Sequence, residues 1–184
     1  LNILLQNYWM VIHPPVLFLG FASTVVPFAF AMGGVWSKKY GDWVRPALPW
    51  AVFGCMVLGT GILMGGAWAY EALSFGGVWA WDPVENGILL SGIVFIAGLH
   101  TMQIFRARHT SLSGSYIFII LAHLLILYST FLTRSGILGE SSVHSFTDLG
   151  LSGQLLIFMF LFILLAIILL AARWRKIPSN PKDE

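Results

Sequence analysis

The chain has 184 residues, of which 58% are hydrophobic and 10% are charged, and its mean hydropathy is +0.83. Soluble domains carry about 25% charged residues, so these charges are too few to cover a water-facing surface, and an ordinary soluble domain is excluded. The net charge is only +2, and the single cysteine, Cys55, excludes an internal disulfide and a C-x-x-C-H site within the chain. We expect Cys55 to be a small apolar residue inside a helix.

Five apolar stretches are each long enough to cross a bilayer as a helix, which takes about 20 residues. In chain order they lie near 15–36, 46–67, 83–105, 115–133 and 153–172. Residues 1–12 are apolar but short, and we expect them to lie along the membrane interface and to run into the first helix; a sixth span that includes them would need a re-entrant turn at Pro14-Pro15. The predicted fold class is an all-α integral membrane protein with about five transmembrane helices. Because no Met precedes Leu1, we expect residues 1–184 to be one membrane-embedded domain of a longer chain.

Basic residues are unevenly distributed over the connections between these stretches. Nine of the ten lie in the first connection, the third connection and the tail: Lys38, Lys39, Arg45, Arg106, Arg108, Arg173, Arg175, Lys176 and Lys182. Only Arg134 lies elsewhere, at the start of the fourth connection. The positive-inside rule makes the first group cytoplasmic. It therefore puts the N-terminus outside, the C-terminus inside, and the second and fourth connections on the outer face of the membrane. Topology thus explains the basic residues, and we expect no nucleic-acid partner.

The second connection, residues 66–82, is longer than a turn requires and is rich in aromatic residues and glycine. At its end Asp82 suits a helix N-cap, Pro83 the first helical position, and Glu85 the reciprocal position of a capping box. The fourth connection, residues 134–152, is also long. Long loops often carry function, and both connections are predicted on the same side of the membrane.

Three tryptophans, Trp68, Trp79 and Trp81, give the second connection its aromatic character. An interfacial belt of aromatic residues explains such side chains. However, a belt does not require the flanking glycine pairs Gly65-Gly66 and Gly76-Gly77. Glycine lets the backbone approach a flat ligand closely, so indoles and glycines together favour a binding surface for a planar, apolar macrocycle.

Two histidines are predicted on the same side as this aromatic connection. His13 precedes Pro14-Pro15 at the mouth of the first helix, and His144 lies in the fourth connection. Imidazole is a common axial ligand of haem iron, so the pair can bind a haem from both faces. The alternative is that His13 only caps a helix and that His144 is a solvated loop residue.

The remaining histidines lie elsewhere. His100 is within the third helix, about 9 Å from its cytoplasmic end, and either binds a second haem inside the membrane or hydrogen-bonds to a neighbouring helix. His123 lies at a similar depth in the fourth helix. Neighbouring helices pack about 8–10 Å apart, which leaves too little room for a haem between the two, so we expect a polar contact for His123. His109 is expected to be solvated.

The segment Trp79-Ala80-Trp81-Asp82-Pro83-Val84-Glu85-Asn86 resembles the tryptophan-rich "WWD" motif of haem-handling proteins. Three groups share this motif: the CcmF haem lyase subunit, the CcmC haem translocator and the CcsA synthase subunit. Asp-Pro-Val-Glu-Asn at 82–86 is closer to the CcmF group than to the Asp-Pro-Lys-Glu-Thr typical of CcsA. The order and spacing of His13-Pro14-Pro15, Arg134-Ser135-Gly136 and Ser142-Val143-His144-Ser145-Phe146 also match the CcmF group.

The resemblance implies a cytochrome c haem lyase subunit that acts within a complex. Such a subunit attaches haem b covalently to the C-x-x-C-H thiols of apocytochrome c, and its partners include a haem chaperone and other cytochrome c maturation subunits. The resemblance makes His13 and His144 the axial ligands of the outer haem. It makes His100 one ligand of a second haem within the membrane, whose other ligand comes from a later helix.

The same resemblance assigns the aromatic connection to the outer haem. Trp68, Trp79 and Trp81 would hold the macrocycle, while Asp82 and Glu85 would fix the start of the third helix and so aim the connection. His123 matches no histidine of the group.

Three other functions remain open. A haem carrier or translocator would bind haem outside without forming bonds to protein. A CcsA-type cytochrome c synthase subunit would share the motif, although its usual Lys-Glu-Thr sequence differs from Val84-Glu85-Asn86. A structural subunit whose aromatics form a belt would show no haem spectrum after purification.

Overall fold

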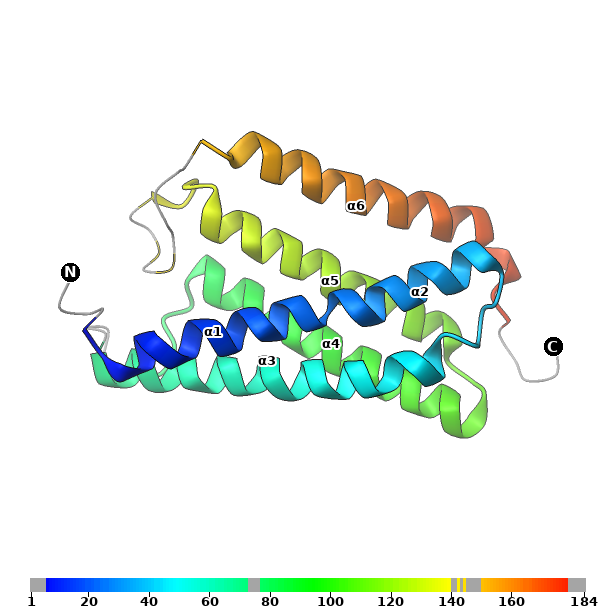
Figure 1. The fold of residues 1–184 in the computed structure, drawn as a ribbon, viewed down its shortest axis with the longest axis horizontal. Coiled ribbons are helices and arrows are strands. Elements are labelled where there is room, and N and C mark those ends of the chain that lie inside the picture. Colours follow the sequence, from blue (N-terminus) through cyan, green and yellow to red (C-terminus); the bar gives the residue numbers. More distant parts are fainter. Residues whose placement is uncertain (1–5, 73–76, 140–141, 143, 145–149, 179–184) are drawn as a thin grey trace.

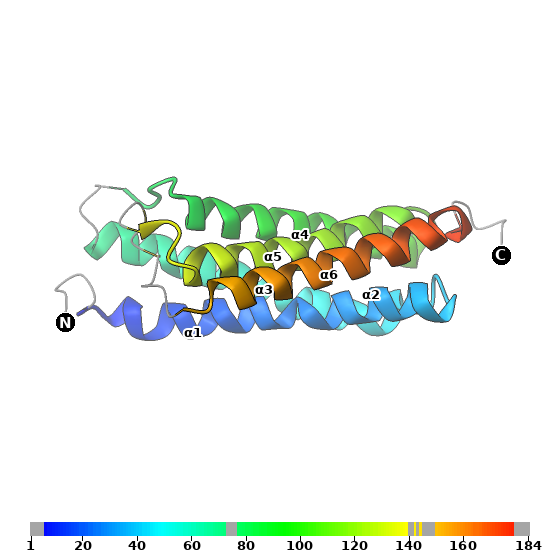
Figure 2. The ribbon, with the colours of Figure 1, turned by 90° about the horizontal axis from the view of Figure 1, so that it is seen from above.

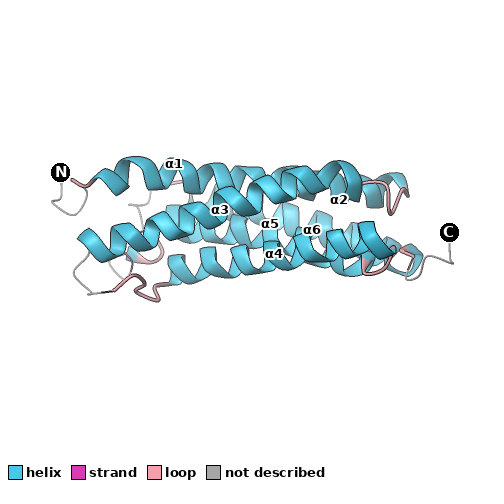
Figure 3. Cartoon of the chain, turned by 90° about the horizontal axis from the view of Figure 1, so that it is seen from below, coloured by secondary structure: helices cyan, strands magenta, loops and turns pink. Residues whose placement is uncertain are grey.

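The computed structural model describes residues 6–72, 77–139, 142, 144 and 150–178. In these residues the chain forms α-helices, one short 3₁₀ helix and no strand (Figure 3). The helices are α1 (Tyr8–Ser23), α2 (Val25–Ser37), α3 (Val44–Ala72), α4 (Pro83–Arg108), α5 (Leu112–Arg134) and α6 (Ser152–Arg173), and the 3₁₀ helix η3 (Trp174–Lys176) follows α6. The predicted all-α class is confirmed for the part of the chain that the structure describes.

Five helical segments are long and apolar enough to cross a membrane, as the hydropathy pattern predicted. The first is formed by α1 and α2 together, and α3, α4 and α5 supply the next three. The last is α6 with η3. The helices α4, α5 and α6 begin and end within three residues of their predicted positions, whereas α3 continues five residues beyond its predicted end at residue 67.

The first helix begins earlier than the prediction. Asn7 caps it, since its side chain accepts a hydrogen bond from the backbone N–H of Trp9 at 2.9 Å. Residues 8–12 belong to α1, and Pro14 and Pro15 lie inside the helix. Residues 8–12 therefore run into the first helix as expected, the helix begins earlier than the predicted residue 15, and no re-entrant turn forms at the prolines. Two prolines remove only two N–H donors, which a membrane helix packed against neighbours tolerates.

A break at Thr24 separates α1 from α2 within the first span. The backbone N–H of Thr24 donates to the carbonyl of Phe21 at 3.1 Å, and its hydroxyl donates to the same carbonyl at 2.7 Å. This local i→i−3 bonding tightens the turn. The two helices remain nearly in line (Figure 1), and Thr24 is buried between them and their neighbours.

The spans run side by side along one long axis and alternate in direction (Figures 1 and 2). One end of the bundle holds the N-terminus, the α3–α4 connection and the α5–α6 connection (Figure 1). We call it the histidine end, because His13 and His144 lie there. The opposite end holds the α2–α3 and α4–α5 connections and the C-terminus. We call it the basic end, because Lys38 and Arg106 lie there.

Helices α1 and α3 pack closely because glycines remove side chains from their contact. A Cβ atom on Gly20 would lie 2.7 Å from the Cα atom of Leu58, and one on Gly61 would lie 2.9 Å from the Cα atom of Leu17. Small residues of this kind let membrane helices approach backbone to backbone. At the histidine end, the indole N–H of Trp9 donates to the carboxylate of Glu71 at 2.7 Å and ties the start of α1 to the end of α3.

Candidate functional site

His13 lies in the second turn of α1 and faces α3. Its side chain is only 6% exposed. Its Nδ1 atom lies 2.9 Å from the carbonyl oxygen of Gly61. A carbonyl only accepts hydrogen bonds, so Nδ1 carries the proton and Nε2 carries the lone pair. A Cβ atom on Gly65 would lie 2.8 Å from the imidazole Cε1 atom, so only glycine leaves room for the ring at that position. Close helix packing therefore fixes both the place and the tautomer of His13.

His144 follows α5 and bonds to Asp82 at the start of α4. Its Nδ1 atom lies 2.8 Å from Oδ2 of Asp82. Because the ionised carboxylate accepts, Nδ1 again carries the proton and Nε2 the lone pair. The backbone N–H of His144 donates to the hydroxyl of Ser142 at 3.0 Å, and that hydroxyl donates to the same carboxylate oxygen at 3.1 Å. The imidazole is thus held from two directions.

Asp82 is the N-cap of α4, which confirms the capping prediction. Its Oδ1 atom accepts the backbone N–H groups of Val84 and Glu85 at 2.7 and 2.9 Å. Burial opposes ionisation of the carboxyl, but the hydrogen bonds from His144, the Glu85 backbone and Ser142 outweigh it, together with attraction to His144, and hold the pKa of Asp82 below its ordinary value. The group is therefore an anion at neutral pH.

Glu85 departs from the capping box that the sequence suggested. Its carboxylate accepts the backbone N–H of Ala80 at 2.7 Å, two residues before the cap, rather than that of Asp82 itself. Reaching back this far pins the segment that carries Trp79 and Trp81. Glu85 is buried and thus fixes the connection, as its predicted role requires.

Trp68 lies on the last turns of α3, not in a loop, and is 4% exposed. Its ring is stacked on His13 with centroids 6.2 Å apart and meets His144 edge-on with centroids 5.9 Å apart. The same indole therefore orients both imidazoles. Because Trp68 is buried against the two histidines, its ring is not accessible to a ligand.

Trp79 and Trp81 differ from Trp68 in being accessible. Trp79 is half-buried, and its indole N–H points to the side-chain oxygen of Asn86 at 3.4 Å. Trp81 is 71% exposed and has a φ of 59°, in the left-handed region that bulky residues avoid. The amide of Asn86 donates to the Trp81 carbonyl at 3.0 Å and stabilises this conformation. A strained backbone that presents a large indole to the outside is typical of a binding site.

The two histidines share one small cavity with Trp79 and Glu85, and Gly65 also lines it. Its volume is about 30 Å³, which is room for one or two water molecules and not for a porphyrin. The donor atoms themselves fit haem iron, because each imidazole has its Nδ1 proton engaged and its Nε2 lone pair left for a metal. The donor set thus fits haem iron, although the cavity as it stands does not have the volume of a porphyrin.

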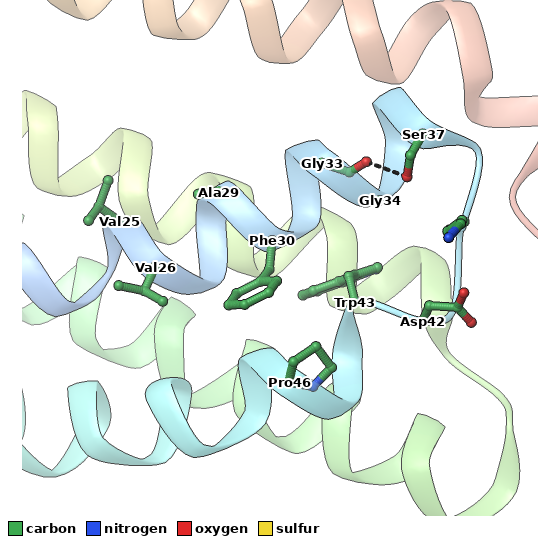
Figure 4. A pocket seen from close by; sticks show the side chains of 11 residues that line it. Val25, Val26, Ala29, Phe30, Gly33, Gly34, Ser37, Asp42, Trp43 and Pro46 are labelled. Carbon is green, nitrogen blue, oxygen red and sulfur yellow. Dashed lines mark hydrogen bonds between the residues drawn. The ribbon is translucent and has the colours of Figure 1, made fainter.

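A much larger cavity lies near the basic end and is not part of this site. It has a volume of about 550 Å³ and lies between α2 and the start of α3 (Figure 4). Phe30, Trp43 and Pro46 line its apolar wall, and Lys39 and Asp42 lie at its polar edge. The described residues that line it include no histidine, so size alone does not identify the site.

The remaining histidines, His100, His109 and His123, have different surroundings. His100 is exposed on α4, about 26 Å along the helix from Pro83. His123 is buried, and its Nδ1 atom lies 2.9 Å from the Thr24 hydroxyl. The expected polar contact for His123 is confirmed. His109 is the exposed C-cap of α4, and Phe105 accepts its backbone N–H at 2.8 Å.

Sequence reasoning missed three residues that hold the site. Gly61 supplies only a carbonyl oxygen, which every residue has, so no side chain could reveal it. Gly65 was assigned to a ligand surface together with Gly66, whereas it lies within α3 and accommodates His13. Ser142 was visible in the Ser-Val-His segment two residues before His144, and this spacing is typical of a hydroxyl that accepts a backbone N–H.

Fold and site together define a helical integral membrane protein with a pair of imidazoles and several indoles gathered at one end of the bundle. Residues 1–139 match the family described as Cytochrome C assembly protein. The chain belongs to this family.

Named relatives agree with this assignment. The chain is 38% identical over 182 residues to cytochrome c-type biogenesis protein CcmF of Escherichia coli, covering 98% of this chain and 28% of that protein. It is 35% identical to the probable cytochrome c-type biogenesis protein NrfE of the same organism, covering 98% of this chain and 32% of the relative. A solved structure of cytochrome c haem lyase CcmF superposes with a TM-score of 0.66 at 33% identity, over 92% of this chain and 32% of that one. The chain thus spans about a third or less of the length of the proteins it matches.

Proposed function

We propose that this chain is the haem-handling part of a cytochrome c haem lyase subunit, with His13 and His144 as axial ligands of the haem that is attached. The observation that carries this proposal is the shared cavity of the two imidazoles, each with its Nδ1 proton bound to oxygen and its Nε2 lone pair left over. Family membership and the name of the matching solved structure support it.

The reaction is the addition of two apocytochrome thiols to the two vinyl groups of haem b. In each addition the sulfur bonds to one vinyl carbon, the thiol proton goes to the other, and the C=C π bond is lost. Atoms and electrons balance without an added oxidant or reductant. The protein's contribution is therefore to hold the porphyrin in place and to leave its vinyl edge open to the C-x-x-C-H segment.

Individual side chains divide this work. His13 and His144 would bind the iron, and Trp68 packs against both imidazole rings and orients them. Trp79 and Trp81 supply flat surface for the macrocycle, because, unlike Trp68, they have accessible area.

His100 belongs to a different haem in this proposal. It lies in a membrane-spanning helix, on a face that the described residues leave open. An ionisable side chain within a span is a functional residue by default. We assign it to a membrane haem b, for which His100 would be one ligand and the remainder of the full-length protein would supply the other; such a haem would supply electrons to the outer iron.

The proposed location is the inner membrane, with the histidine end on the periplasmic face. The Lys and Arg residues at the basic end support this orientation. The expected partners are a haem chaperone, apocytochrome c and other cytochrome c maturation subunits, with lipid around the spans and no nucleic acid.

Haem content of the full-length protein tests the ligand assignment. His13→Ala and His144→Ala should each lose the outer haem while the helical content, measured by circular dichroism, stays the same. His109→Ala, at the basic end, is the matched control and should retain it. Unchanged haem content in both ligand variants would remove the assignment. Mass spectrometry of an apocytochrome substrate should in parallel show loss of covalent haem in the two variants.

Orientation is tested by labelling from one side of the membrane. On a Cys55→Ala background, Val78→Cys at the histidine end should react with a membrane-impermeant maleimide added from the periplasm. Asp42→Cys at the basic end should react only after the cytoplasmic side is opened. The reverse pattern would overturn the proposed topology.

A further inference from the structure

The two carboxylate oxygens of Asp82 serve different partners. Oδ1 accepts two backbone N–H groups and caps α4. Oδ2 accepts from Nδ1 of His144 at 2.8 Å and from the hydroxyl of Ser142 at 3.1 Å. A helix cap needs only one oxygen, and Asn or Ser caps a helix about as well as Asp. The cap therefore does not explain why the residue is an acid.

We infer that Asp82 is a positioning residue that makes His144 the stronger of the two iron ligands. This inference rests on the proposed function of His13 and His144. A hydrogen bond from Nδ1–H to a carboxylate fixes the tautomer and orientation of a ligating imidazole and raises the basicity of its Nε2 atom.

The two imidazoles differ in the partner that each has. His13 donates to the carbonyl of Gly61, which is neutral, at 2.9 Å. His144 donates to a carboxylate, which is anionic, at 2.8 Å. Hydrogen bonds to ionised acceptors are roughly twice as strong as those between neutral groups. The more electron-rich imidazole is that of His144, and it favours ferric over ferrous iron more strongly than His13 does.

Burial makes the Asp82–His144 contact effective. Asp82 is 9% exposed, and the side chain of His144 is 18% exposed. Water competes little for the carboxylate oxygen there, so the hydrogen bond keeps most of its strength. Trp68 contacts the edge of the His144 ring and prevents it from turning away. The imidazole therefore has one orientation, with Nε2 directed away from Asp82.

Unequal ligands have a consequence for the reaction. In the product, the histidine of the C-x-x-C-H segment must take one axial position on the iron. The weaker ligand leaves first, so His13 is the ligand that the substrate histidine replaces, while His144 keeps the haem in place.

Asp82→Asn separates this role from capping. Asparagine still caps α4, but its amide nitrogen cannot accept from Nδ1–H of His144. In the full-length protein, with the outer haem bound, haem affinity should fall about 10–100-fold. The reduction potential should rise, by about 59 mV for each tenfold loss that falls on the ferric form alone. Asp42→Asn is the matched control: it makes the same carboxylate-to-amide change at an exposed position of the basic end, and it should leave the affinity and the potential unchanged.

Asp82→Ser is a second variant in case asparagine disturbs the fold. Serine caps the helix through its hydroxyl and has no second oxygen for His144, so it should reproduce the loss of affinity and the rise in potential. Unchanged affinity and potential in folded Asp82→Asn and Asp82→Ser would overturn the inference, provided His144→Ala loses the haem. If His144→Ala retains the haem, the proposed function fails instead.

Discussion

His13 and His123 are two buried histidines in the same bundle, and they have different surroundings. Their exposed fractions are 6% and 5%. The Nδ1 atom of each lies 2.9 Å from an oxygen, that of Gly61 for His13 and that of Thr24 for His123. By burial and by hydrogen bonding they are equivalent.

What differs is the space beside each ring. His13 lines a cavity that His144 also lines. The His123 ring packs between Phe28 and Phe162, with centroids 4.6 and 5.9 Å away. Burial therefore does not identify a ligand. The identifying feature is a second imidazole across a shared cavity, and at His123 aromatic rings take that place.

Among changes near His13, removing Trp68 should have the largest effect. Trp68→Ala deletes a buried indole that contacts both site imidazoles, so it should destabilise the protein by about 3–5 kcal/mol and also lower haem content. Thermal unfolding in detergent and the haem-to-protein ratio measure the two effects. A variant with normal stability and normal haem would contradict the role of Trp68 as the common support.

Removing the imidazole of His123 should lower the stability of the protein and leave haem binding unchanged. His123→Ala loses a hydrogen bond to Thr24 and leaves a cavity between two phenyl rings, at a cost of about 2–4 kcal/mol. At a temperature where the variant is folded, its haem spectrum should match that of the unchanged protein. Loss of haem from the folded variant would contradict a purely structural role for His123.

A methyl group added at Gly65 should displace the His13 ring without changing the imidazole itself. Gly65→Ala places a carbon 2.8 Å from the ring, so either the ring or the helix must shift, at a cost of about 1–3 kcal/mol. We expect weaker haem binding. Gly59→Ala, one and a half turns away on α3, is the control, because a Cβ atom there meets nothing within 4 Å. Equal haem affinity in the two variants would mean that the position of His13 does not matter.

The smallest effect on stability is expected at Trp81. Its indole is largely exposed, so Trp81→Ala should change the free energy of unfolding by less than about 0.5 kcal/mol. It should nonetheless weaken haem binding, because accessible indole area is lost. Titration of haem into the apoprotein measures this. If binding is unchanged, Trp81 belongs to the membrane interface and not to the site.

Hydropathy and charge were sufficient to predict the spans and to place the two site histidines at one end. Long apolar stretches have few alternatives in a membrane, and the order of connections then decides which residues share an end. Asp82 as a cap was also predictable, because capping depends on residues that are close in sequence.

The rest depended on contacts between distant segments. His123 meets Thr24 across 99 residues of chain, and His144 meets Asp82 across 62. Composition does not encode which faces of α2 and α5 turn toward one another. Pro14 and Pro15 misled the prediction of the first helix, because their cost is local whereas the packing that offsets it is tertiary.

The most direct test of the central claim is the coordination state of the outer haem. In full-length protein with His100→Ala, which should remove the proposed membrane haem, the visible and electron paramagnetic resonance spectra should show low-spin iron with two imidazole ligands. Adding His13→Ala or His144→Ala should abolish that signal, while adding His123→Ala should leave it intact. A two-imidazole signal that survives both of the first substitutions would contradict the account.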